Sequence, residues 1–153
     1  MDKVIRGFHH TSFTVGDLER SLGFYRDLLG MAVVYHVAER STPYLAEITG
    51  FPGVRMATAL LRPTVDSTDL LELIEYIEPR GTPLEVQTCH PGSAHLCLIT
   101  DDLRALYERL QTAGVLFRSP PVELNTGPNA GGWSVYSLDP DGITIEFFQP
   151  ASR

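Results

Sequence analysis

The sequence predicts an α+β fold built from two copies of a βαβββ unit in a chain of 153 residues. Residues 10–25 and 95–107 share one phrase, which runs from a histidine through an Asp-Leu pair to an aromatic residue. Short apolar runs alternate with the period of a strand, and two longer runs have the period of a helix. Each copy closes on a strand that carries a glutamate, Glu72 in the first and Glu146 in the second.

The first half of the chain contains a strand, a helix and three further strands. Residues 8–15 alternate in hydropathy, and Asp17 then provides a helix N-cap. Leucine and tyrosine recur on one face of a helix over about 18–29, and Gly30 occupies the usual position of a left-handed C-cap. Three β-branched or aromatic runs bounded by turn residues follow, over 31–37, 54–62 and 69–77.

The second half repeats this order. A strand over 93–99 leads to a helix over 102–113, which Gly114 ends. The remaining strands are expected at 115–117, 132–138 and 143–149. Asp139-Pro140-Asp141-Gly142 supplies a tight turn between the last two, because proline fixes one torsion and glycine accepts positive φ.

Composition predicts one soluble cytoplasmic domain over 1–153, with modules at about 8–78 and 93–150. Apolar residues make up 43% of the chain, enough for a sizeable core. A formal charge of −7 argues against nucleic acid or anionic lipid as partners. No run approaches the roughly 20 apolar residues of a membrane span. Two cysteines are too few for a disulfide framework and are expected to be reduced.

The first copy has more residues between its histidine and its glutamate than the second. The excess is placed in 38–53, where turn residues mix with apolar ones. Such a segment is either a lid or a surface loop with its own small cluster.

Strand parity tests whether the histidines and glutamates share one side of the sheet. In each strand, the apolar alternates occupy the side that must take the helices. The opposite side then carries four side chains that can bind a divalent metal ion: His10, Glu72, His95 and Glu146. The same parity selects His10 rather than His9 and Glu72 rather than Glu75. Imidazole and carboxylate ligands suit Zn, Ni, Co, Mn or Fe.

Two segments carry a resemblance to a known superfamily: His10-x4-Val15-x-Asp17-Leu18-x2-Ser21-Leu22-x-Phe24-Tyr25 and Asp139-Pro140-Asp141-Gly142-x3-Glu146. The chain resembles the vicinal oxygen chelate superfamily, which includes glyoxalase I, methylmalonyl-CoA epimerase, extradiol dioxygenases and bleomycin-resistance proteins. The resemblance implies two βαβββ modules that form a cupped mixed sheet with helices on its outer face. It also implies a metal held by the four side chains that parity selects.

The implied chemistry is a metal-dependent lyase or isomerase reaction on a small molecule with two neighbouring oxygens. The ion stabilises an enolate while a glutamate, Glu146 or Glu72, accepts the proton. The resemblance does not separate glyoxalase I from epimerase activity. The exposed edges of a cupped sheet favour a homodimer, and the resemblance leaves open whether the metal is held within one chain or between two.

Two other functions stay open. An iron-dependent extradiol dioxygenase needs only His10, His95 and Glu146, and a fourth ligand at Glu72 argues against it because it removes an open position. A metal-free binding protein of the bleomycin-resistance kind needs none of these ligands. Four intact ligand-type residues therefore favour the lyase or isomerase.

Further residues are candidates for contact with substrate. They are Tyr76, on the same side of its strand as Glu72, and Arg55, Asn129 and Trp133. The glycine-containing segment 125–133 lacks the Lys-Ser/Thr ending of a P-loop, so it is expected to be a flexible rim loop instead.

Overall fold

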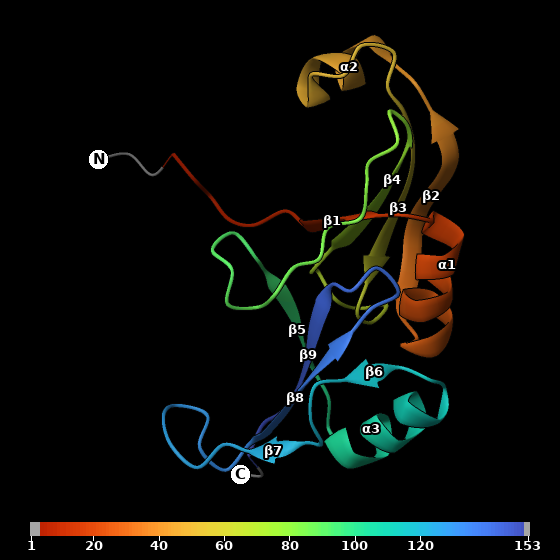
Figure 1. The fold of residues 1–153 in the computed structure, drawn as a ribbon. Coiled ribbons are helices and arrows are strands. Elements are labelled where there is room, and N and C mark those ends of the chain that lie inside the picture. Colours follow the sequence, from red (N-terminus) through yellow and green to blue (C-terminus); the bar gives the residue numbers. More distant parts are fainter. Residues whose placement is uncertain (1–3, 152–153) are drawn as a thin grey trace. The chain divides into compact units, whose positions relative to one another are not determined.

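A computed structural model of the protein describes residues 4–151. The chain divides into two compact units, Met1–Pro83 and Leu84–Arg153, and each contains one mixed β-sheet (Figure 1). The α+β class and the two strand-helix-strand units predicted from the sequence are confirmed. Among the described residues, no helix has both the length and the apolar character that a membrane crossing requires.

Unit 1 contains a four-stranded sheet in the order β1-β4-β3-β2. Its elements are β1 Thr11–Val15, α1 Leu18–Leu22, η1 Gly23–Leu28, β2 Ala32–Arg40, α2 Pro43–Thr49, β3 Arg55–Arg62 and β4 Leu71–Glu78. The first strand runs parallel to β4, whereas β2, β3 and β4 pair in antiparallel fashion. The parallel pair places β1 and β4, which are far apart in the sequence, at adjacent positions in the sheet.

The predicted helix over 18–29 is present, but its second half is a π-helix rather than an α-helix. The backbone N–H of Leu29 donates to the carbonyl of Phe24, five residues back, at 2.9 Å. The wider turn accompanies burial of two consecutive aromatic side chains, Phe24 and Tyr25, whose rings pack edge to face at 5.0 Å. A regular helical period cannot show this change of turn, so the sequence pattern missed it.

The extra segment of the first copy contains a helix that the sequence analysis did not predict. β2 continues to Arg40, and α2 then begins with Pro43 in its first turn and ends at Gly50, whose φ is 74°. Only Leu45 of this helix is buried, in a cluster with Val54 and Met56. A seven-residue helix with one buried anchor has too few turns to produce a visible apolar period.

Unit 2 contains a five-stranded sheet in the order β5-β9-β8-β6, with β7 also paired to β8. Its elements are β5 His95–Ile99, α3 Leu103–Thr112, β6 Leu116–Phe117, β7 Val122–Glu123, β8 Trp133–Leu138 and β9 Thr144–Gln149. The sequence predicted one strand at 115–117, whereas two short strands lie along β8. Pro120 and Pro121 lie between them and have no N–H to donate, which explains the break.

Equivalent hydrogen bonds join the N-terminus of α1 to β4 in unit 1 and the N-terminus of α3 to β9 in unit 2. The backbone N–H of Leu18 donates to Glu75 Oε2 at 2.9 Å, and that of Leu103 donates to Gln149 Oε1 at 2.8 Å. The predicted N-cap at Asp17 is also confirmed, and Asp102 caps the second helix in the same way, since each carboxylate accepts a backbone N–H within the first turn. These bonds identify the face of each sheet that carries the helix. We call the opposite face the open face.

Replacing Glu75 with alanine is expected to lower the free energy of unfolding by about 1–2 kcal/mol, because a helix N-terminal N–H loses its acceptor. Urea denaturation measures the change. Glu78, at the exposed end of the same strand, is the matched control, and its alanine variant is expected to change stability by less than about 0.5 kcal/mol. Equal effects of the two substitutions would show that the bond to Leu18 does not stabilise the helix.

Candidate functional site

In unit 1 the open face brings His10 and Glu72 together. His10 lies just before β1, and Glu72 lies in β4, opposite Ser12 in the parallel ladder. The Nε2 atom of His10 is 3.4 Å from Glu72 Oε2. The other ring nitrogen, Nδ1, lies 2.7 Å from Nδ1 of His9. One of these two nitrogens must carry the hydrogen, and His9 thereby helps to orient the His10 ring.

Unit 2 repeats this pair at matching positions. His95 is the first residue of β5, and Glu146 lies in β9, opposite Cys97 in the parallel ladder. The Nε2 atom of His95 is 3.1 Å from Glu146 Oε2. In both units the glutamate is mostly buried and the histidine is more exposed. The residues that are equivalent in the sequence repeat therefore form equivalent His–Glu pairs in the structure.

The helix-facing residues explain why parity separates Glu72 from Glu75. Side chains three residues apart in a strand point to opposite faces of the sheet. Glu75 and Gln149 therefore reach the helices, whereas Glu72 and Glu146 face the histidines. Glu75 is thus already engaged by the N-terminus of α1 and by Arg80, at 3.8 Å. Metal binding by Glu72 stays a prediction.

The donor atoms of each pair fit a divalent metal ion. Bonds of about 2.0–2.2 Å from imidazole nitrogen and carboxylate oxygen place two adjacent ligand atoms about 3.0–3.4 Å apart. The separations of 3.4 Å in unit 1 and 3.1 Å in unit 2 match that range, which a direct hydrogen bond also gives. Among the described residues of either unit, no group of three or more His, Cys, Asp or Glu side chains is arranged to hold an ion. Each unit by itself offers two ligands.

Three further side chains surround Glu146. The hydroxyl of Ser134 donates to Glu146 Oε1 at 2.6 Å, and Tyr136 lies directly opposite Glu146 in the antiparallel ladder, with its ring 5.2 Å from that of His95. Burial, followed by the charge and hydrogen bonding of Glu146, raises the pKa of the Cys97 thiol to about 11. Burial and the same carboxylate also raise the pKa of Tyr136. Both groups are therefore neutral near pH 7, and Cys97 is a thiol, not a thiolate.

Cys97 is expected to react slowly with iodoacetamide in chelator-treated protein, because only the thiolate attacks and about a thousandth of this group is ionised at about pH 8. The rate should rise about tenfold for each pH unit until about pH 11. Mass spectrometry of a Cys89→Ser variant measures alkylation of Cys97 alone, since the chain has two cysteines. Glu146→Gln should accelerate the reaction, and an unchanged rate would show that the carboxylate does not affect the thiol.

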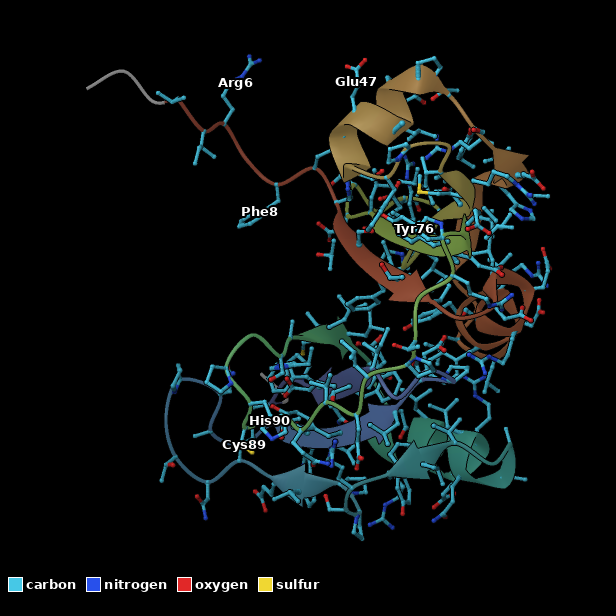
Figure 2. All side chains as sticks on the ribbon, turned by 45° about the horizontal axis from the view of Figure 1, so that its top comes forward. Arg6, Phe8, Glu47, Tyr76, Cys89 and His90 are labelled. Atoms are coloured by element: carbon cyan, nitrogen blue, oxygen red, sulfur yellow. The ribbon has the colours of Figure 1, made fainter. Side chains whose placement is uncertain are left out.

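Tyr76 and Arg55 lie in different surroundings. Tyr76 is on the same face of β4 as Glu72, beside the α2 helix, and packs against the Leu45 cluster and edge to face with Phe51, at 6.0 Å (Figure 2). Arg55 Nε donates to Glu39 at 2.8 Å in an exposed ion pair. Tyr76 thus shares the face of the candidate ligand, and Arg55 already has a partner. Substrate binding by either residue stays a prediction.

Asn129 lies in the loop that precedes β8, and Trp133 is the first residue of that strand. The carbonyl of Asn129 accepts the N–H of Gly132 at 3.0 Å, which closes a turn. Trp133 is opposite Gln149 in the ladder and lines a cavity of about 640 Å³ with Tyr107 and other residues of α3. Trp133 therefore lies on the helix side of its sheet, not on the open face with Glu146. Substrate contacts of both residues remain predictions.

Ser134 and Tyr136 are residues of the site that the sequence patterns did not indicate. Their positions could nevertheless be predicted from the sequence, because the Asp139–Gly142 turn fixes the register between β8 and β9. Counting back from that turn places Tyr136 opposite Glu146 and Ser134 one step further along the same face.

Comparison with known proteins shows the family of the chain. Residues 7–147 match the family described as the Glyoxalase/Bleomycin resistance protein/Dioxygenase superfamily. A 2-epi-5-epi-valiolone epimerase of an Actinomyces species is 27% identical over 143 residues, which span 90% of this chain and 76% of that protein. A lactoylglutathione lyase of Haemophilus influenzae is 28% identical over 145 residues, which span 94% of this chain and 92% of that protein.

The fold comparison extends over the whole chain. The crystal structure of a glyoxalase family protein from Bacillus cereus has a TM-score of 0.84 and covers 99% of this chain and 98% of its own, at 16% identity. That similarity concerns the fold alone. Because the family match spans nearly all of the sequence, this chain belongs to the Glyoxalase/Bleomycin resistance protein/Dioxygenase superfamily.

Proposed function

We propose that the protein is a divalent-metal-dependent lyase or isomerase that removes a proton from carbon next to a carbonyl group. The observation that supports this most directly is the repeated His–Glu pair on the open face of each sheet. Relatives named a lactoylglutathione lyase and an epimerase, each matching at least 90% of the chain, support an enzyme of this kind.

The proposed ligands of the ion are the two pairs together: His10, Glu72, His95 and Glu146. In each pair the imidazole Nε2 faces a carboxylate oxygen, so both are available as donors. When bound, a divalent ion stabilises the negative charge that develops on a substrate oxygen. The ligands could come from one chain or from two chains of a homodimer, and light scattering of the purified protein distinguishes these cases, since a monomer excludes a shared site.

The glutamates provide the base that this reaction needs. A carboxylate oxygen takes the proton from the substrate carbon and later returns it to carbon, so the enzyme ends each cycle in its starting protonation state. The implied substrate is a small molecule with a carbonyl and a neighbouring oxygen.

Elemental analysis of untagged protein, purified without chelator, tests the proposal together with a Glu72→Ala variant. We expect near-stoichiometric Zn, Ni, Co or Mn that decreases in the variant. Iron that is retained in the variant would favour a dioxygenase, which needs only three ligands. No metal after reconstitution would favour a binding protein and overturn the proposal.

The reaction itself is tested by incubating the metal-loaded protein with thiol adducts of 2-oxoaldehydes and with acyl-CoA thioesters in D₂O. Proton NMR then reports deuterium that enters at the carbon next to the carbonyl. Consumption of dioxygen by a catechol substrate, without such exchange, would replace this function by the dioxygenase.

A further inference from the structure

We propose that Ser134 is a positioning residue that holds the Glu146 carboxylate in place, so that Glu146 stays a ligand and Glu72 takes the proton. This inference rests on the proposed function and assigns different tasks to two glutamates that the sequence repeat makes equivalent. It follows from contacts within each unit.

Glu146 is held at both carboxylate oxygens. Oε1 accepts the Ser134 hydroxyl at 2.6 Å, and Oε2 lies 3.1 Å from His95 Nε2. A donor–acceptor distance of 2.6 Å is typical of a strong hydrogen bond from a hydroxyl to a charged carboxylate. Cys97 is the neighbour of Glu146 in the parallel ladder.

Glu72 is held at only one oxygen. Oε2 lies 3.4 Å from His10 Nε2, and among the described residues we find no other polar partner of this carboxylate. Leu60 is directly opposite Glu72 in the ladder, where unit 2 has Tyr136 opposite Glu146. Ser12 is its neighbour in the parallel ladder but makes no hydrogen bond to it.

The corresponding hydroxyl of unit 1 has a different partner. Thr58 occupies the place in unit 1 that Ser134 occupies in unit 2, since each is one step along the open face from the residue opposite the glutamate. The Thr58 hydroxyl is buried and accepts a hydrogen bond from Arg40 Nη2 at 3.2 Å. The hydroxyl that corresponds to Ser134 thus contacts Arg40, and within the part of the chain that the structure describes no hydroxyl bonds to Glu72.

These contacts determine how easily each carboxylate moves. A carboxylate that leaves the metal to reach a substrate carbon must rotate about its side-chain bonds. For Glu146 that rotation breaks a charged hydrogen bond inside a partly buried site, whereas Glu72 breaks no such bond. Glu72 is thus the carboxylate that is free to collect the proton.

The test compares Ser134→Ala with Ser134→Thr, which keeps a hydroxyl, and with Ser12→Ala, which removes an exposed hydroxyl beside the other glutamate. Isothermal titration with Ni²⁺ or Co²⁺ measures affinity without any substrate. We expect Ser134→Ala to weaken binding about tenfold to a hundredfold and the other two variants to stay within about threefold of the wild type. Circular dichroism of chelator-treated protein verifies that each variant is folded.

Proton exchange at saturating metal gives the second readout. Because Glu72 performs that step, Ser134→Ala should lose far less exchange at saturating metal than Glu72→Gln, which is expected to lose about 10²–10⁴-fold. An unchanged affinity in Ser134→Ala would overturn the positioning role, and a large loss of exchange at saturating metal would make Glu146 the base. Failure of the wild type to bind metal would contradict the proposed function instead.

Discussion

Alanine at His10 or at His95 is expected to remove most of the metal-binding capacity of the protein while leaving both units folded. Each histidine supplies one of four proposed ligands, and each is 38–41% exposed, so its loss leaves no cavity in a core. Loss of one imidazole ligand should weaken binding by well over about a hundredfold, more than the loss of an outer-shell partner does. Elemental analysis and titration with Co²⁺ measure the effect, and circular dichroism reports the fold.

His36 provides a matched control for these variants. Its Nε2 atom lies 3.3 Å from Glu19 Oε1, so it forms a His–Glu pair of similar length that has no counterpart in the sequence repeat. His36→Ala should leave metal content unchanged. Equal losses in His36→Ala and His10→Ala would show that metal binding does not depend on the repeated pairs, and unfolding of the His10 and His95 variants would indicate a structural metal.

Glu72→Gln is expected to slow proton exchange at carbon by about 10²–10⁴-fold, because an amide cannot accept the proton. Metal content should decrease much less, since the amide oxygen remains as a weaker ligand. Deuterium incorporation followed by NMR at saturating metal measures the chemical step separately from metal loading. The substitution keeps size and shape, which leaves the neighbouring Leu60 contact in the ladder unaltered.

The exchange rate of Glu146→Gln, compared with that of Glu72→Gln, shows which glutamate is the base. The Ser134 hydroxyl can still bond to the amide oxygen, so the side chain should stay in place and the exchange rate should decrease by less than about tenfold. The reverse order, with Glu146→Gln much slower than Glu72→Gln, would assign the base to Glu146. Equal losses in the two variants would mean that both carboxylates transfer protons.

Much of the fold could be predicted because its signals are local. Asp17 is a helix cap, as expected, and Asp102 is another, because a short carboxylate can accept a backbone N–H three residues on. Gly30 and Gly114 have φ of 80° and 87° after their helices, which only glycine adopts without strain. The predicted turn after Asp139 is confirmed, since its carboxylate accepts the N–H of both Asp141 and Ile143.

The elements that sequence patterns missed are those whose formation depends on distant partners. The α2 helix has one buried residue, Leu45, and its burial comes from Val54 and Met56. The short strand β7 is defined by its pairing with β8, since two residues are too few to show the alternation of a strand. The π-helical turn accompanies the burial of Phe24 and Tyr25, and burial is a property of the folded chain.

By itself the sequence determined which residues are equivalent in the two copies and which side of each strand they face, because repeat and strand period are properties of the chain. Tertiary structure alone decided how the equivalent residues differ. Ser134 was placed against Glu146, and Arg40 was placed against the corresponding threonine. Each is a hydrogen bond between separate elements, and such a bond depends on how strands and helices meet in space.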